Sequence, residues 1–85
     1  MLAYVNIRLK PDVLDPQGET IAQVLKELGF DRVTSVRQGK RIELTLDETN
    51  ASIAYDLVRA MCEQLLVNPV IETYDITLDT NEINT

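Results

Sequence analysis

The sequence contains no histidine and only one cysteine, Cys62. Without histidine, neither a Ser-His-Asp nor a Cys-His catalytic arrangement can be built within the chain. A single cysteine cannot form an internal disulfide, and metal sites made of histidine and cysteine are likewise excluded. Cys62 falls on the apolar stripe of a predicted helix, so we expect a buried apolar residue and not a nucleophile. The three glycines stand apart from one another, so no Gly-rich phosphate loop is present.

Long apolar runs are also missing, as is an excess of positive charge. No run approaches the ~20 residues that a membrane-spanning helix requires. The first eight residues lack the basic and apolar regions of a signal peptide. A net charge of −6 opposes binding to nucleic acid and to anionic membranes. These absences predict a cytoplasmic protein with neither a nucleic-acid nor a membrane partner.

The chain that remains is short and ordinary in composition. It has 85 residues, of which 45% are apolar and 26% charged, as in soluble globular proteins. We predict a single domain over residues 1–79, followed by a frayed polar tail at residues 80–85. A domain of this size buries a small core, so self-association would add useful burial.

Hydrophobic periodicity predicts four strands and two helices. The predicted strands are residues 2–10, 33–38, 40–46 and 70–78, and the predicted helices are residues 16–28 and 51–67. The second strand has the weakest pattern, and Gly39 after it predicts a turn that makes an antiparallel hairpin with the third. Gly29 fits the position after the first helix, and Asn50 or Thr49 fits the N-cap of the second.

The order strand, helix, strand, strand, helix, strand predicts an α+β fold of the ferredoxin-like βαββαβ type. It would have a four-stranded antiparallel sheet with both helices on one face. The other face would then be open and polar, facing either water or another subunit, and the edge strands would be available for pairing with a further copy. A 37-residue shift that superimposes apolar positions, such as Val5 on Ile42, agrees with two βαβ halves.

The chain changes from strand to helix at residues 13–19. Asp15 suits an N-cap, Pro16 the first helical position, and Glu19 the positive end of the helix dipole. Gly18 is unexpected, because glycine in a helix costs up to ~1 kcal/mol relative to alanine. Either the turn is closely packed, or a partner's backbone approaches there. In the second case Gly18→Ala would stabilise the isolated fold slightly, if its φ permits, and weaken assembly.

Other functions of this fold lack their signatures here. An RNA-recognition domain would carry aromatic residues on its central strands, but the third predicted strand presents Arg41, Glu43 and Thr45. No paired-cysteine loop for a metal is present, and the first loop is too acidic for a phosphate cradle. A regulatory domain that binds a small ligand is compatible with the sequence.

Three segments together resemble one known family. They read VLDPQG at residues 13–18, VRQGKRIEL at 36–44 and MCEQLLVNPVIETY at 61–74. Their order, their spacing and the total length resemble the PurS family, the small subunit of phosphoribosylformylglycinamidine (FGAM) synthase. The similarity extends from the first strand to about Leu78.

The resemblance implies a function in de novo purine biosynthesis. In the multi-subunit synthase, a PurQ-like glutaminase subunit releases ammonia, and a PurL-like synthetase subunit uses ATP and Mg²⁺ to incorporate it. PurS-like subunits have no active site and bind no cofactor. They form homodimers or dimers of dimers, assemble the two catalytic subunits and support ammonia transfer. The alternative is a stand-alone regulatory domain of the same fold that binds a small ligand.

The resemblance implies no catalytic, cofactor-binding or metal-binding residue in this chain. The predicted partner-interface residues are Asp15, Gln17 and Gly18 at the hinge, and Arg37, Gly39 and Lys40 at the hairpin. Turn and cap chemistry is an alternative role for each, especially for Asp15 and Gly39. Arg37 and Lys40 form a basic pair on an acidic chain, which could meet an acidic or phosphate-bearing partner surface.

Overall fold

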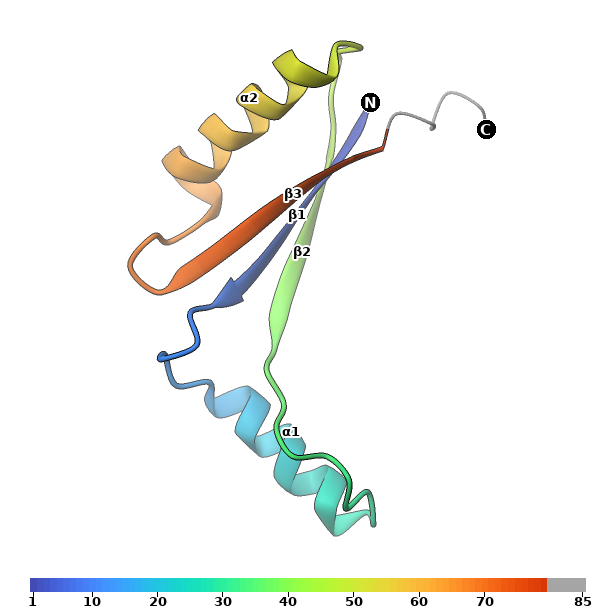
Figure 1. Ribbon diagram of the computed structural model, residues 1–85, viewed down its shortest axis with the longest axis vertical. Helices are drawn as coiled ribbons and strands as arrows, with labels where there is room; N and C mark the ends of the chain where they lie inside the picture. The colour runs from blue at the N-terminus through green and yellow to red at the C-terminus, as the bar shows by residue number, and fades with distance from the viewer. Residues whose placement is uncertain (80–85) are drawn as a thin grey trace.

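The computed structural model describes residues 1–79 and shows a small antiparallel sheet with two helices (Figure 1). Its elements are β1 (Leu2–Leu9), α1 (Pro16–Glu27), β2 (Gly39–Thr45), α2 (Ala51–Met61), the π-helical turn η1 (Cys62–Leu66) and β3 (Glu72–Asp79). The strand order is β2-β1-β3, so β1 is central and the other two strands are edges. The predicted tail at residues 80–85 lies outside the described residues.

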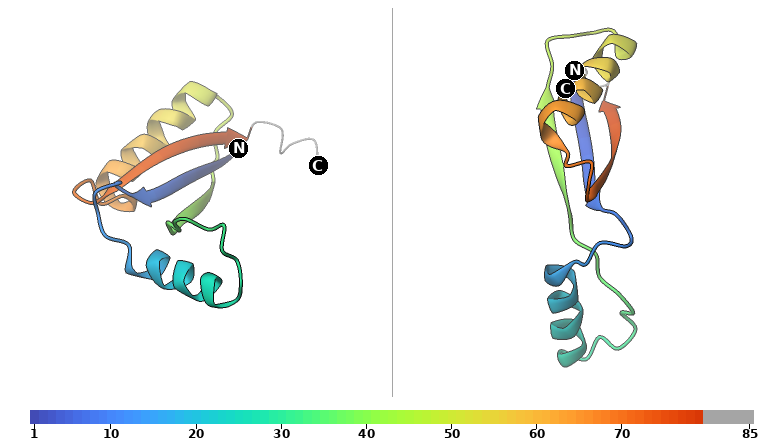
Figure 2. Two further views of the ribbon diagram at one scale, coloured as in Figure 1. Left: turned by 60° about the horizontal axis from the view of Figure 1, so that its bottom comes forward. Right: turned by 90° about the vertical axis from the view of Figure 1, so that its left-hand side faces the viewer.

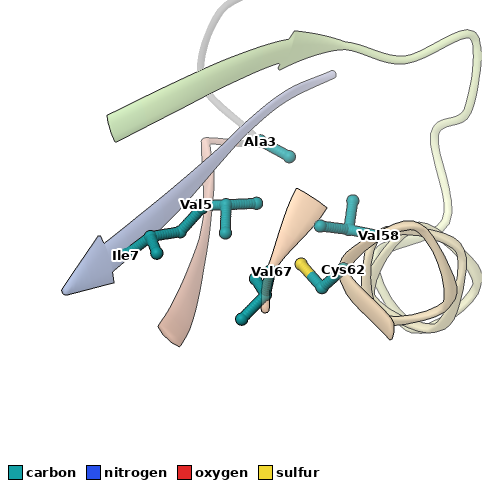
Figure 3. Packing of buried hydrophobic residues seen from close by; sticks show 6 residues of the cluster. All are labelled: Ala3, Val5, Ile7, Val58, Cys62 and Val67. Carbon is teal, nitrogen blue, oxygen red and sulfur yellow. The ribbon is translucent and has the colours of Figure 1, made fainter. Parts of the chain in front are cut away.

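The core lies between one face of the sheet and α2. The alternation in β1 places Ala3, Val5 and Ile7 on this inner face, where each is at most 2% exposed. Val58 of α2 and Cys62 of η1 point toward them (Figure 3). The antiparallel register pairs Val5 with Ile42 on one side and with Ile76 on the other, which continues the apolar face across the sheet.

The second predicted helix, residues 51–67, is confirmed as α2 continued by η1. Asn50 is its N-cap, because its Oδ1 accepts the Ile53 N–H at 3.0 Å. The widened turn ends at Val67, whose N–H donates to the Cys62 carbonyl at 3.1 Å. Asn68 then starts the turn into β3, where its carbonyl accepts the N–H groups of Ile71 and Glu72.

The prediction of a strand at residues 33–38 is wrong. The described part of the chain has three strands and not four. Gly39 does not reverse the chain. It is the first residue of β2 and pairs with Arg8 of β1. Because no reversal occurs there, residues 33–38 run on into β2 and cannot fold back to pair with it.

The prediction that both helices cover one face of the sheet is also wrong. Of the two helices in the described range, α2 is the one that packs on the sheet, where it contacts β3. α1 lies beyond the end of the sheet, and the segment after it runs back alongside the helix (Figures 1 and 2). We name residues 16–35 the arm, and we name the two connections to the sheet, residues 10–15 and 36–38, the waist.

The arm makes the chain elongated. Its Cα radius of gyration is 16.5 Å, whereas a compact domain of this length has one of about 12 Å. The apolar stripe of α1 therefore finds no sheet to cover it. Val24 is 45% exposed and Leu28 is 67% exposed.

Candidate functional site

All six residues predicted at an interface lie in the waist or directly next to it. Asp15 ends one connection and Arg37 lies in the other. Gln17 and Gly18 lie in the first turn of α1, and Gly39 and Lys40 begin β2. The two groups are about twenty residues apart in the sequence, and the hydrogen bond from the Gln38 N–H to the Asp15 carboxylate joins the two segments that carry them.

The Asp15 carboxylate fastens the two connections to each other. One oxygen accepts the Gly18 N–H at 3.0 Å and the other accepts the Gln38 N–H at 2.7 Å. The bonds from Gln38 and Gly18 lower the pKa of Asp15, because both stabilise the ionised carboxylate, and the positive charge of Arg37 adds to the effect. Asp15 is thus both the predicted N-cap of α1 and a link to the segment before β2.

Gly18 and Gly39 occupy places where two backbones come close together. A Cβ on Gly18 would lie 2.3 Å from the Val36 carbonyl oxygen. A Cβ on Gly39 would lie 2.5 Å from the Ile7 carbonyl oxygen. Gly18 is buried, and its contact is with this chain's own backbone. The close-packing explanation therefore accounts for Gly18, and a stabilising Gly18→Ala change is not expected.

The other three predicted residues, Gln17, Arg37 and Lys40, are exposed. The Arg37 guanidinium donates to the Lys10 carbonyl at 2.8 Å, which joins the two connections a second time. Lys40 Nζ lies 3.9 Å from a Glu72 carboxylate oxygen. Gln17 lines a groove of about 410 Å³ with Pro16, Thr20, Ile21 and Gln38.

Two basic residues that were not predicted as site residues, Arg8 and Arg41, join Arg37 and Lys40. All four line a concavity of about 390 Å³, together with Asn6, Ile7 and Gly39. The sequence shows Arg8 and the group at residues 37–41 as separate basic clusters. The β1–β2 register, which pairs Arg8 with Gly39 and Asn6 with Arg41, unites them.

Among the described residues, the features to consider for catalysis are a cluster of metal ligands and the one thiol, Cys62. Within residues 1–79 no group of three His, Cys, Asp or Glu side chains is placed to hold a metal ion. Cys62 is fully buried, and burial, with the nearby Glu63 charge, raises the pKa of its thiol. The thiol is therefore protonated at neutral pH and a poor nucleophile. No helix within the described range is long and apolar enough to cross a membrane.

Comparison with known families gives one match that spans nearly the whole chain. The sequence model of the family described as "PurS: Phosphoribosylformylglycinamidine (FGAM) synthase" matches residues 2–80. The curated relatives named phosphoribosylformylglycinamidine synthase subunit PurS include proteins of Synechocystis and Thermotoga maritima. The Synechocystis protein is 46% identical over 82% of this chain and 70% of its own length. The Thermotoga maritima protein is 42% identical over 85% of this chain and 88% of its own.

Solved structures agree with this match. PurS of Methanocaldococcus jannaschii, described as a subunit of formylglycinamide ribonucleotide amidotransferase, has a TM-score of 0.84 and 41% identity. The alignment covers 92% of this chain and 94% of that one. A chain in the structure of PurLQS from Thermotoga maritima has a TM-score of 0.79 and 40% identity over 91% of this chain and 96% of that one.

Proposed function

The chain belongs to the PurS family, and on this basis we propose that it is the small subunit of a phosphoribosylformylglycinamidine synthase. Its role is to associate with PurL-type and PurQ-type subunits in purine biosynthesis. The observation that carries this proposal is the similarity, along nearly the whole chain, to a chain of the PurLQS structure. The resemblance seen in the sequence is confirmed as family membership, and the regulatory-domain alternative gains no support.

A non-catalytic role in that assembly is consistent with the residues. The chain lacks histidine, and its one thiol is buried. We propose that it binds no cofactor, that ATP and Mg²⁺ act on the synthetase partner, and that the complex is cytoplasmic. The contribution of this subunit would then be assembly of the glutaminase and the synthetase, and support of ammonia transfer between them.

We further propose that the chain functions as a homo-oligomer. The apolar stripe of α1 is exposed: Ile21 is 40%, Val24 45% and Leu28 67% exposed. An apolar stripe of this kind gains free energy only when another surface covers it. Because the waist carries α1 past the end of its own sheet, the covering surface must come from a second copy or another subunit.

A second copy offers a suitable surface. α2 contacts β3, and the inner-face residues Ile42 and Leu44 of β2 are only partly buried. Each copy thus has an uncovered apolar helix and an incompletely covered apolar strand. Mutual covering of these two surfaces in a symmetric dimer is the self-complementary arrangement typical of homo-oligomers. A dimer of dimers through the open sheet edges is a further possibility that light scattering distinguishes.

Reconstitution tests the accessory role. The purified chain is combined with PurL-type and PurQ-type subunits, ATP, Mg²⁺, glutamine and formylglycinamide ribonucleotide. We expect glutamine-dependent product formation to require this chain, whereas ammonia-dependent formation by the PurL-type subunit does not. If glutamine-dependent product forms equally well without the chain, the accessory role is wrong. Turnover by the isolated chain would instead indicate an enzyme in its own right.

A further inference from the structure

We propose that four side chains, Arg8, Arg37, Lys40 and Arg41, form a basic patch that docks an acidic surface of a different subunit of the synthase. The inference rests on the proposed function and adds which surface of this chain makes the heteromeric contact. It also specifies the chemistry of the partner surface, namely exposed carboxylates in a convex region that fits the concavity between the four side chains.

The patch is formed beside the waist, where β1 ends and β2 begins. Arg8 lies two residues after Asn6 in β1, and Arg41 of β2 pairs with Asn6. Both arginines therefore lie on the same polar face of the sheet as Asn6. The Arg41 guanidinium lies over the Tyr4 ring, 3.9 Å from its centroid. Arg37 is held by its hydrogen bond to the Lys10 carbonyl. Two of the four cationic groups are therefore already positioned in the free subunit, which reduces the entropy lost on binding.

The positive charge of the patch stands out against the rest of the chain. The net charge is −6, yet the four patch residues and Lys10 are five of the eight basic residues. Arg8 lies 3.9 Å from an Asp75 carboxylate oxygen, and this exposed pair is weak. Lys40 lies 3.9 Å from a carboxylate oxygen of Glu72, whose side chain is only 16% exposed, so the charge of Lys40 is partly balanced within the chain. Within residues 1–79, no carboxylate lies within 4.0 Å of Arg37 or Arg41. Most of this charge is thus available to a partner.

Exposure of the patch favours a protein surface over a small anion. All four side chains are exposed, and their concavity is bordered by the sheet face and not enclosed. Sites for small molecules usually bury most of the ligand's surface, whereas exposed arginines in a shallow polar region are typical of protein interfaces.

The chemistry of the patch also favours a different subunit over a second copy. Interfaces between copies tend to be more apolar, and the arm already supplies an exposed apolar surface for such a contact. A charged surface instead gives specificity and a fast, salt-dependent association with an acidic partner.

Binding measurements with matched variants test the proposal. The intact chain and its variants are titrated into PurL-type and PurQ-type subunits by calorimetry at several NaCl concentrations. The patch variants are Arg37→Gln/Arg41→Gln and, as a second pair that leaves the Tyr4 and Lys10 contacts intact, Arg8→Gln/Lys40→Gln. The control, Arg32→Gln/Arg59→Gln, removes the same charge from exposed positions elsewhere. Circular dichroism verifies that each variant is folded.

We expect each patch double variant to raise the Kd by roughly tenfold or more at low salt. The control double variant should raise it by less than about threefold. The salt dependence of binding should also be shallower for the patch variants. Equal Kd values for patch and control variants would overturn the inference. So would dissociation of the homo-oligomer by the patch variants in light scattering, or patch-dependent binding of inorganic phosphate with unchanged partner affinity. If the wild-type chain binds neither subunit, it is the proposed function that fails.

Discussion

Asp15 and Gln38 are 23 residues apart in the sequence, and a hydrogen bond of 2.7 Å from the Gln38 N–H to the Asp15 carboxylate joins them. The same carboxylate caps α1 through Gly18. One side chain therefore fixes both the start of the helix and the approach of the returning segment. The direction of the arm relative to the sheet depends on this link.

Asp15→Asn is expected to lower the stability of the fold at neutral pH, because the amide loses the charge-assisted bonds to Gln38 and Gly18. The pKa of Asp15 is lowered in the folded state. Its stabilisation is therefore fully present above the unfolded-state pKa of about 3.8 and is lost as pH falls toward the folded-state value. Chemical denaturation should thus show a difference between wild type and variant that shrinks below about pH 4. Asp12→Asn, at an exposed carboxylate nearby, is the control. A difference that persists unchanged at low pH would contradict this account.

Gly18→Ala is expected to destabilise the fold by about 1–3 kcal/mol, as overpacking in a closely packed region does. The added Cβ would meet the Val36 carbonyl oxygen at 2.3 Å, which forces the first turn of α1 and the returning connection apart. Urea unfolding measures the change. The adjacent Gln17→Ala, at an exposed position, should change the free energy of unfolding by no more than about 0.5 kcal/mol. If Gly18→Ala were as stable as the wild type, the backbone around Val36 could move to accept the added Cβ without any loss in the free energy of unfolding.

Val24→Asp is expected to shift the chain toward monomer, because it places a charge on the exposed stripe that we propose a second copy covers. Multi-angle light scattering across a concentration series should show the self-dissociation constant rising by roughly tenfold or more. Gln23→Asp adds the same charge at the neighbouring exposed position and serves as the control. If both variants remain as associated as the wild type, the stripe is not the self-contact.

The Cys62 thiol is expected to react slowly in the folded chain, since it is fully buried and its pKa is raised. A thiol-specific chromogenic disulfide at pH 7 should modify it on the order of 100-fold more slowly than in guanidinium, because reaction requires opening of the core. The unfolded chain supplies the reference rate. Rapid modification of the folded protein would show that η1 opens readily and that the thiol is accessible.

Local signals in the sequence were sufficient for several elements. The alternation of Val5 and Ile7 with polar residues predicts β1, and the caps Asp15 and Asn50 are confirmed by their hydrogen bonds. Gly29 has a φ of +99°, as its predicted position after α1 requires. For the two caps and Gly29 the deciding interactions lie within a few residues along the chain, so the sequence alone reveals them. For β1 the alternation of apolar and polar residues is itself a local pattern. The family resemblance likewise depends on sequence and is confirmed by the matches.

Tertiary structure alone decided the course of the chain at Gly39 and the position of α1. Gly39 is compatible locally with a turn, but close packing against Ile7 and pairing with Arg8 hold it in β2. The stripe of α1 shows that the helix needs an apolar partner, but not whether that partner is its own sheet. The gathering of Arg8 with Arg41 depends in the same way on strand register. These outcomes are set by contacts between residues distant in the sequence, for which hydrophobic periodicity carries no information.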